Sequence, residues 1–224
     1  MGRLKPEIIA ARISGAVLHK HPFSYIRYND GEAMFMANND YCEKRFYGGM
    51  FPEPFRSQLK RDMRKAYLNC DIIGITGDEQ QDRGHYYNLS YHMAHIVSDA
   101  ELGCARDPID WHDNDLYEMM LHGNVNLVTC HDVGDKFKER FGVEPNVIKI
   151  LRPARGATQH MADYAKFLNI AVKKELYFVS WSLLGKAICG HIKAHGGVAV
   201  DIGAIIDGWM GMQTRSYHSE KYRL

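Results

Sequence analysis

Two carboxylates separated by one glycine form the most chemically suggestive group in the sequence. They are Asp30 and Glu32, in the run Asn-Asp-Gly-Glu at 29–32 that follows the aromatic and β-branched stretch 23–28. These compositions predict a buried strand, a tight turn and a short helix. Carboxylates at a strand end can hold a divalent cation, and Arg27 beside them can bind an anion. The same run is also an ordinary turn and helix start, which the local sequence alone favours.

Polar side chains that could meet a substrate also follow the other predicted strands. A parallel sheet collects the carboxyl ends of its strands at one edge, where α/β proteins usually bind ligands. The resulting rim is both acidic and basic, which suits a substrate that carries phosphates and a cation. Arginines can bind a diphosphate bidentately, and a helix N-terminus can receive a phosphate. The candidates are Thr76, Asp78, His131, Asp132, Arg152, Arg155, Ser180, Ser182 and Asp201.

Plainer explanations exist for several of these residues. Arg152 and Arg155 could be solvated surface residues, and Asp201 could cap a turn or a helix. The run 179–186 only weakly resembles a strand-to-helix nucleotide loop, because it lacks the glycine spacing of GxGxxG and of the Walker A loop. A dinucleotide-binding Rossmann enzyme is therefore disfavoured. Cys130 and His131 are not predicted to form a dyad, since neighbours on one strand point to opposite faces.

The composition is that of one ordinary globular domain, which we expect to span residues 1–224. The chain has 224 residues, of which 46% are hydrophobic and 25% charged. A net charge of +1 gives no reason to expect binding to nucleic acid. Five scattered cysteines without a CxxC pattern predict reduced thiols and a cytoplasmic protein. We expect no integral membrane segment and no signal peptide; the oligomeric state is not readable.

Strands and helices alternate along most of the chain. This pattern predicts an α/β fold, a single Rossmann-like domain with a mostly parallel sheet and helices on both faces. Residues 107–115 are expected to form a loop, and 41–50 a loop or short helix. The expected strands are 23–28, 71–76, 125–129, 147–151, 176–180 and 198–203. The expected helices are 6–20, 52–69, 86–104, 116–122, 134–141, 158–168 and 183–195.

Two segments resemble a known family. The run Arg27-Tyr28-Asn29-Asp30-Gly31-Glu32 is similar to the Arg-Phe-Gly-Asp-Gly-Glu motif of bacterial glycosyltransferases with the GT-D fold, formerly the domain of unknown function 1792. The strand and helix at 177–195, followed by Asp201-Ile202-Gly203 and Asp207-Gly208-Trp209, resemble the C-terminal block of the family. Tyr28 and Asn29 replace the usual Phe and Gly. Asn tolerates left-handed backbone geometry, so we expect the turn to survive.

The resemblance implies a GT-D type fold and a hexosyl- or pentosyltransferase of glycan biosynthesis. The donor would be a nucleoside-diphosphate sugar, commonly a UDP-sugar, and the acceptor a hydroxyl of a glycan or glycoconjugate. It implies that Asp30 and Glu32 serve the donor diphosphate through Mn²⁺ or Mg²⁺. The base that activates the acceptor stays open among Asp78, Asp132 and Asp201. The expected catalytic residues are Asp30 and Glu32, together with Asp201. The expected donor-binding residues are Arg27, Asn29, Arg152, Arg155, Ser180 and Ser182.

Two other functions stay open from the residues alone. A metal-dependent hydrolase of nucleotide sugars or phosphate esters could use the same carboxylates, and it would turn over without an acceptor. A non-catalytic nucleotide-binding module would bind UDP and show neither hydrolysis nor transfer.

Overall fold

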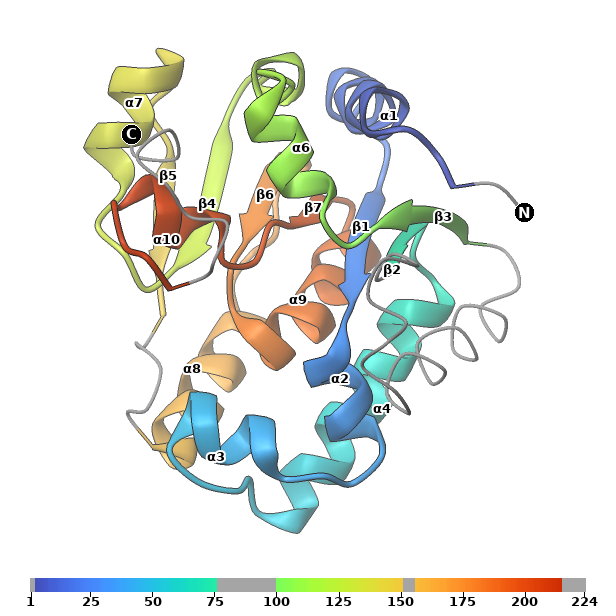
Figure 1. The fold of residues 1–224 in the computed structure, drawn as a ribbon, viewed down its shortest axis with the longest axis vertical. Coiled ribbons are helices and arrows are strands. Elements are labelled where there is room, and N and C mark those ends of the chain that lie inside the picture. The colour runs from blue at the N-terminus through green and yellow to red at the C-terminus, as the bar shows by residue number, and fades with distance from the viewer. Residues whose placement is uncertain (1–2, 76–99, 151–155, 215–224) are drawn as a thin grey trace.

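A parallel β-sheet forms the centre of the molecule (Figure 1). The structure, a computed structural model, describes residues 3–75, 100–150 and 156–214, with only the backbone at Asp30. Within these ranges the sheet has seven strands in the order β3-β2-β1-β7-β6-β4-β5, and every pairing is parallel. The strands are β1 (Phe23–Tyr28), β2 (Ile72–Ile75), β3 (Glu101–Cys104), β4 (Val125–Thr129), β5 (Asn146–Lys149), β6 (Leu176–Val179) and β7 (Val198–Asp201). The predicted α/β class is confirmed.

Helices cover both faces of this sheet. In Figure 1, α1, α6 and α7 lie in the upper part of the view, while α3, α4 and α8 lie in the lower part. The described helices are α1 (Pro6–Leu18), α2 (Asp30–Met36), α3 (Tyr41–Tyr47), α4 (Glu53–Leu68), α6 (Asp107–Asp113), α7 (Gly134–Phe141), α8 (Ala157–Leu168), α9 (Ser182–Ala194) and α10 (Ile205–Trp209). A 3₁₀ turn, η2, spans Glu118–Met120.

Each face of the sheet has its own hydrophobic core. Successive strand residues point to opposite faces, so Tyr25 joins one core and Ile26 the other. The core around Tyr25 holds aromatic residues of α6, α7 and α10, and Tyr117 packs its ring edge against Trp209 at a centroid distance of 5.2 Å. The core around Ile26 is built from α4, α8 and α9. The carboxyl ends of the strands are therefore held between two packed layers.

The packing of α9 against α4 fixes the helix that carries several site residues. A Cβ added at Gly190 of α9 would come within 2.5 Å of the Cβ of Ala66 on α4, so the two helices touch almost backbone to backbone. A residue larger than glycine would force the helices apart. The start of α9 at Ser182 is consequently held in a defined position over the sheet.

Two expectations about local structure are wrong. Residues 101–104 were expected to end a helix, but they form the edge strand β3, which pairs with β2; residues 86–99 of that predicted helix lie outside the described residues. Residues 107–115 were expected to form a loop, but most of them form α6. Pro108 lies in the first turn of α6, where proline is tolerated. The Asp107 carboxylate accepts a hydrogen bond from the backbone N–H of Cys104 at 2.8 Å, which fixes this turn against β3.

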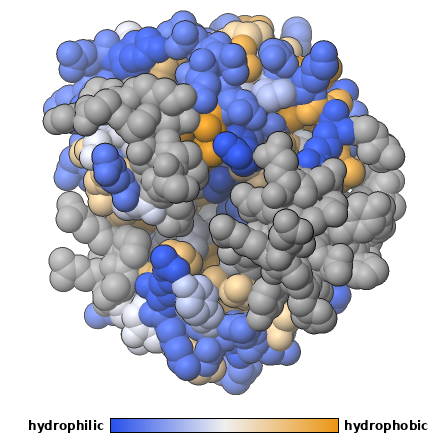
Figure 2. Space-filling model, viewed as in Figure 1, coloured by the Kyte–Doolittle hydropathy of each residue, from blue (hydrophilic) through white to orange (hydrophobic). Residues whose placement is uncertain are grey.

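The described residues visible in Figure 2 form no extended apolar face. The visible side chains there are mostly hydrophilic, and hydrophobic residues form small separate patches. Exposed large hydrophobic residues such as Leu18 and Met119 lie on different elements. None of the helices in the described ranges has the length and apolar character needed to cross a bilayer. The five cysteines, all within those ranges, form no disulfide.

Candidate active site

A cavity of about 740 Å³ lies at the carboxyl ends of the central strands. Its lining includes Arg27 at the end of β1 and Gly203 after β7, together with Ser180 after β6 and His131 after β4. These four strands are consecutive in the sheet order, so their ends converge on one place. Asn29 and Ser182, also expected to bind a donor, line the same cavity.

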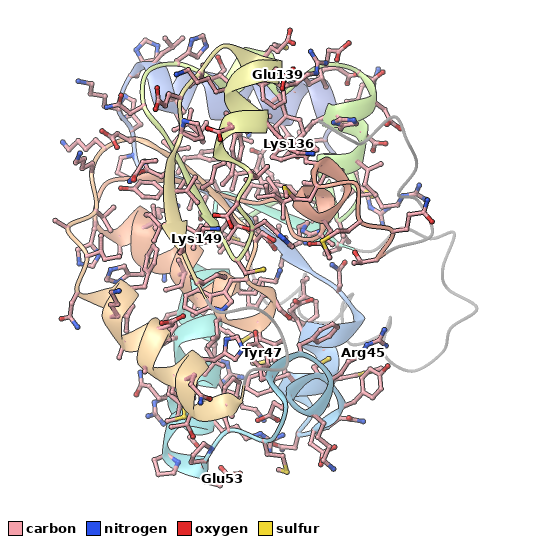
Figure 3. The ribbon with its side chains drawn as sticks, turned by 90° about the vertical axis from the view of Figure 1, so that its left-hand side faces the viewer. Arg45, Tyr47, Glu53, Lys136, Glu139 and Lys149 are labelled. Carbon is pink, nitrogen blue, oxygen red and sulfur yellow. The ribbon has the colours of Figure 1, made fainter. Side chains whose placement is uncertain are left out.

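Helix α3 forms one side of this cavity and contributes aromatic residues to its lining. Figure 3 shows Tyr47 and Arg45 on opposite sides of α3, with Tyr47 buried and Arg45 exposed. The Tyr47 hydroxyl donates to the carbonyl oxygen of Trp181 at 3.3 Å and accepts from the N–H of Leu184 at 3.3 Å. Its ring packs edge-on against His160 at a centroid distance of 4.9 Å. Tyr47 therefore ties α3 to the beginning of α9.

Four charged side chains form a buried network beside the cavity, and three of them, Arg27, Glu32 and Lys186, line it. The ammonium group of Lys186, which is 2% exposed, forms ion pairs with Asp201 and with Glu32, the latter at 3.4 Å between Nζ and Oε1. The guanidinium of Arg27 also pairs with Asp201, at 3.3 Å between Nε and Oδ2. Two cations and two carboxylates from β1, α2, α9 and β7 thus meet here. We refer to these four residues as the buried charge network.

Asp201 is held as a carboxylate inside this network. Burial raises its pKa, but the charges of Arg27 and Lys186 outweigh that effect, and the pKa lies below its usual value. Its Oδ2 also accepts the backbone N–H of Arg27 at 3.2 Å. Both oxygens of Asp201 contact cations, and its side chain is 2% exposed. Asp201 is therefore suited to act as a counter-ion rather than as a proton acceptor.

The glycine of the Asp-Ile-Gly block makes room for Arg27. Gly203 has a φ of +54°, and a Cβ built there would lie 1.5 Å from Nη2 of Arg27. The guanidinium also donates to the carbonyl oxygen of Ala105, after β3, at 3.4 Å. Arg27 therefore packs against the loop after β7 and reaches across the strand ends toward β3.

The predicted strand, turn and short helix at 23–36 are confirmed. β1 ends at Tyr28, Asn29 is the N-cap and α2 begins at Asp30, whose side chain lies outside the described part. Glu32 Oε2 accepts the backbone N–H of Asn29 at 2.9 Å, and the Asn29 side chain completes a capping box. The turn survives with Asn29 in place of glycine, and it does so without left-handed geometry, because the φ of Asn29 is −116°. Glu32 thus has both a structural contact and a charged one.

The carboxylate oxygens beside Lys186 are ligand atoms that suit a cation. Oxygens of Glu32 and Asp201 converge on a single positive group, the Lys186 ammonium. Carboxylate oxygens are the ligands that Mg²⁺ and Mn²⁺ prefer. Within the described residues no three His, Cys, Asp or Glu side chains gather as a metal site. The two carboxylates therefore fit a cation, and in this structure the cation beside them is Lys186.

A histidine–aspartate pair lies on another wall of the cavity. His131 Nε2 and Asp207 Oδ1 are 2.8 Å apart, and Thr214 donates its hydroxyl to Oδ2 of Asp207 at 2.6 Å. Hydrogen bonds to Asp207 and to Cys130 raise the pKa of His131 to about 9, against the opposing effect of burial. His131 is therefore an imidazolium at neutral pH, paired with the Asp207 carboxylate.

The other predicted site residues divide into two groups. Asp132 lines the cavity, pairs with Lys149 and is largely exposed. Ser180 and Ser182 also line it, and Ser182 is the first residue of α9. The remaining four lie outside the described residues: Thr76, Asp78, Arg152 and Arg155.

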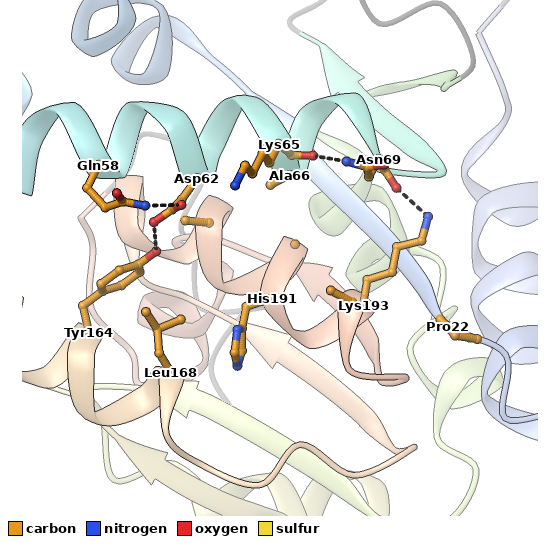
Figure 4. Close-up of a pocket in the computed structure, with 13 residues that line it drawn as sticks. Pro22, Gln58, Asp62, Lys65, Ala66, Asn69, Tyr164, Leu168, His191 and Lys193 are labelled. Atoms are coloured by element: carbon orange, nitrogen blue, oxygen red, sulfur yellow. Dashed lines mark hydrogen bonds between the residues drawn. The ribbon is translucent and has the colours of Figure 1, made fainter.

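A second cavity, of about 660 Å³, lies among α4, α8 and α9 (Figure 4). Tyr164 donates its hydroxyl to Asp62 at 3.1 Å, and Lys193 donates to the carbonyl oxygen of Asn69 at 2.6 Å. Pro22, which precedes β1, also lines it, so this cavity reaches the amino ends of the strands. None of the predicted site residues that the structure describes lines it, and the candidate site is the cavity at the carboxyl ends.

Comparison with known proteins finds one family model and two solved structures that are similar to this chain. A family model described as a GT-D fold-like domain matches residues 4–209. No curated protein matches the chain. A selenomethionine-substituted structure of domain of unknown function 1792 is 14% identical, with a TM-score of 0.57, over 93% of this chain and 87% of that chain. A second structure of that domain, described as having a distinct glycosyltransferase fold, is 15% identical, with a TM-score of 0.55, over 92% and 86%.

The two structures share the architecture of this chain, so the fold is a glycosyltransferase fold. The resemblance noted from the Asp-Gly-Glu run and the Asp-Ile-Gly block is confirmed. Because the family model covers residues 4–209 of 224, this chain belongs to the GT-D fold-like family.

Proposed function

We propose that this chain is a glycosyltransferase that moves a sugar from a nucleoside-diphosphate sugar, with UDP as the nucleotide, to a hydroxyl of a glycan or glycoconjugate. The observation that carries the proposal is the cavity of about 740 Å³, which lies in a glycosyltransferase fold at the carboxyl ends of β1, β7, β6 and β4. Ligands of open α/β sheets bind at this edge.

The donor diphosphate would lie between the loop after β6 and the end of β1. Ser180 and Ser182, which lie just before and at the start of α9, supply hydroxyl groups that can donate to a phosphate. Arg27 lines the same region and adds positive charge. This assignment keeps the serines and Arg27 as donor-binding residues and adds the helix that carries Lys186.

A divalent cation is part of the proposal. Asp30 and Glu32 would hold Mn²⁺ or Mg²⁺, an ion that stabilises the negative charge on a leaving diphosphate. Transfer forms a bond from the acceptor oxygen to the anomeric carbon and breaks the bond to the diphosphate. The acceptor proton passes to a base. Among the described residues, Asp132 is the carboxylate of the cavity wall that we propose for this role, since both oxygens of Asp207 already serve His131 and Thr214.

Release of free nucleotide tests the proposal. The protein is incubated with a panel of nucleotide sugars and Mn²⁺, with and without pooled glycan acceptors. We expect acceptor-dependent release from a UDP-sugar. Acceptor-independent release would indicate a hydrolase, and binding without release a nucleotide-binding module; either result would overturn the transferase.

Two matched substitutions connect that activity to the site. Glu32→Gln should lower the rate of transfer by about tenfold or more, because it removes a charge from the cavity lining. Glu139→Gln is the control. Glu139 is exposed on α7, away from the cavity, as the label in Figure 3 shows. Equal rates in the two variants would remove Glu32 from the mechanism.

A further inference from the structure

The Lys186 ammonium group occupies the point on which two buried carboxylates converge. We propose that Lys186 is a built-in cation of this site and that a divalent cation at Glu32 must compete with it. The inference rests on the metal part of the proposed function. It concerns binding of the ion rather than transfer, so it can be tested without a donor or an acceptor.

The two oxygens of Glu32 have different partners. Oε2 accepts the backbone N–H of Asn29 and so completes the cap of α2, while Oε1 lies 3.4 Å from Lys186 Nζ. The oxygen that is not part of the cap therefore faces the ammonium group. A metal ion bound to Oε1 would lie within a few ångströms of a second positive charge. Like charges at such distances repel strongly in a buried site.

Lys186 has a second carboxylate to which it can stay bound. Its contact with Asp201 is shorter than its contact with Glu32, and Asp201 is also fixed by Arg27. Side chains of both contacts are buried, with Lys186 and Asp201 2% exposed and Glu32 7% exposed. The geometry therefore assigns the Glu32 contact as the one that a metal ion breaks, with Lys186 kept at Asp201.

This arrangement has a consequence for the order of binding. Without a metal, the buried charge network already connects β1, α2, α9 and β7. The protein alone should therefore bind Mn²⁺ weakly. An ion that arrives with a diphosphate brings compensating negative charge, which offsets the repulsion from Lys186.

Direct binding of Mn²⁺ to the protein tests the competition. Free Mn²⁺ is measured by electron paramagnetic resonance during titration of wild type, Lys186→Met and Lys193→Met. Lys193 is a matched control, since it lies on the same helix but pairs with Asp71. Lys186→Met should bind Mn²⁺ about tenfold or more tightly than wild type, because the competing charge is gone. Lys193→Met should bind like wild type.

Two results would overturn the inference. One is an affinity for Mn²⁺ that is the same in Lys186→Met and wild type, including absence of binding in both. The other is a gain in affinity that survives Glu32→Gln in the Lys186→Met background, because the ion would then not be at Glu32. Failure of the transferase proposal is separate, since it is judged by nucleotide release.

Folding of the variants is controlled by thermal melting without metal. Lys186→Met leaves Asp201 and Glu32 buried with only Arg27 as a cation. If that variant does not fold, Lys186→Gln takes its place, since an amide can donate to both carboxylates without carrying a charge. The expected gain in Mn²⁺ affinity and the results that contradict it are the same.

Discussion

The backbone of Gly203 lies against the Arg27 guanidinium, at the place where the end of β1 meets the loop after β7. A Cβ at Gly203 would lie 1.5 Å from Nη2 of Arg27. Alanine there must displace the arginine, and with it one of the two cations that pair with Asp201. The residue type at this position is therefore tied to the buried charge network and not only to the turn.

Substitution of Gly203 by alanine should separate backbone strain from this contact. Gly123 is the matched control, because it also has a positive φ, +75°, but no atom lies within 4 Å of an added Cβ. Left-handed geometry costs alanine about 1–2 kcal/mol at either position. Gly203→Ala should cost about 1–3 kcal/mol more than Gly123→Ala in the free energy of unfolding, measured with urea. Equal losses would show that Arg27 moves aside without cost.

At the residue scale, the sequence predicted which residues line the site better than it predicted which of them contact one another. Arg27, Asn29 and Ser180 line one cavity because carboxyl ends of parallel strands meet, which the strand pattern already indicated. Lys186 was not predicted as a site residue, because a lysine in a helix is usually solvated. The His131–Asp207 pair was also missed. His131 had been listed as a candidate at a strand end and Asp207 as part of the C-terminal block, but only the position of α10 beside the residues after β4 brings them together.

At the scale of elements, the junction between α4 and α9 decides where the start of α9 lies. The Cβ of an alanine at Gly190 would be 2.5 Å from the Cβ and 2.8 Å from the Cα of Ala66. The Cα belongs to the backbone of α4, which cannot turn away as a side chain can. The helices would have to separate, and α9 carries Ser182 and Lys186 into the cavity.

We expect Gly190→Ala to destabilise the protein although alanine favours helices. The propensity gain of about 1 kcal/mol is smaller than the cost of overpacking, about 1–3 kcal/mol. Gly15→Ala in α1 is the control, because nothing lies within 4 Å of its Cβ. That change should stabilise the fold by about 0.5–1 kcal/mol. Thermal melting of the two variants checks the opposite signs, and a stabilised Gly190→Ala would show that α4 and α9 can separate freely.

The elements themselves were predictable where the apolar runs are long, as in β1, β4, β6 and β7. β3 was not, because its four residues contain Gly103 and only half-buried neighbours, and an edge strand gains its stability from a partner far along the chain. Helix α6 was hidden by its aspartates, which are typical of loops. One of them, Asp107, is buried and accepts hydrogen bonds from Tyr25 and Cys104. Tertiary contacts therefore determined the secondary structure of both segments.

At the scale of the whole molecule, the dependence of stability on pH reports ion pairs that join distant parts of the chain. His131 follows β4 and Asp207 belongs to α10, so their pair holds α10 over the strand ends. The pKa of His131 is raised from 6.5 to about 9 in the folded protein. Burial also raises the pKa of Asp107, from 3.8 to about 7. Both groups bind more protons in the folded state, so both lower the stability as pH rises, but in different ranges.

The stabilisation from the His131–Asp207 pair should be complete below pH 6.5 and lost as pH rises through about 9. Asp107 also lowers the stability as it loses its proton, but this loss is complete by about pH 9, since the pKa of Asp107 in the folded protein is about 7. We expect wild type to lose about 1–2 kcal/mol more than Asp207→Asn between about pH 7.5 and about pH 10, after allowance for solvent screening. Urea unfolding at both pH values measures this difference.

Asp135→Asn is the control for that comparison, because Asp135 is exposed on α7. Buried thiols and phenols, among them Cys70 with a pKa of about 12, titrate in every variant and so cancel in the difference. Asp135→Asn should follow wild type across the whole range. If Asp207→Asn also follows wild type, His131 is not charged at neutral pH. The cavity wall would then carry a neutral imidazole, and His131, which is more basic than a carboxylate and is held by Asp207, would be the candidate for taking the acceptor proton.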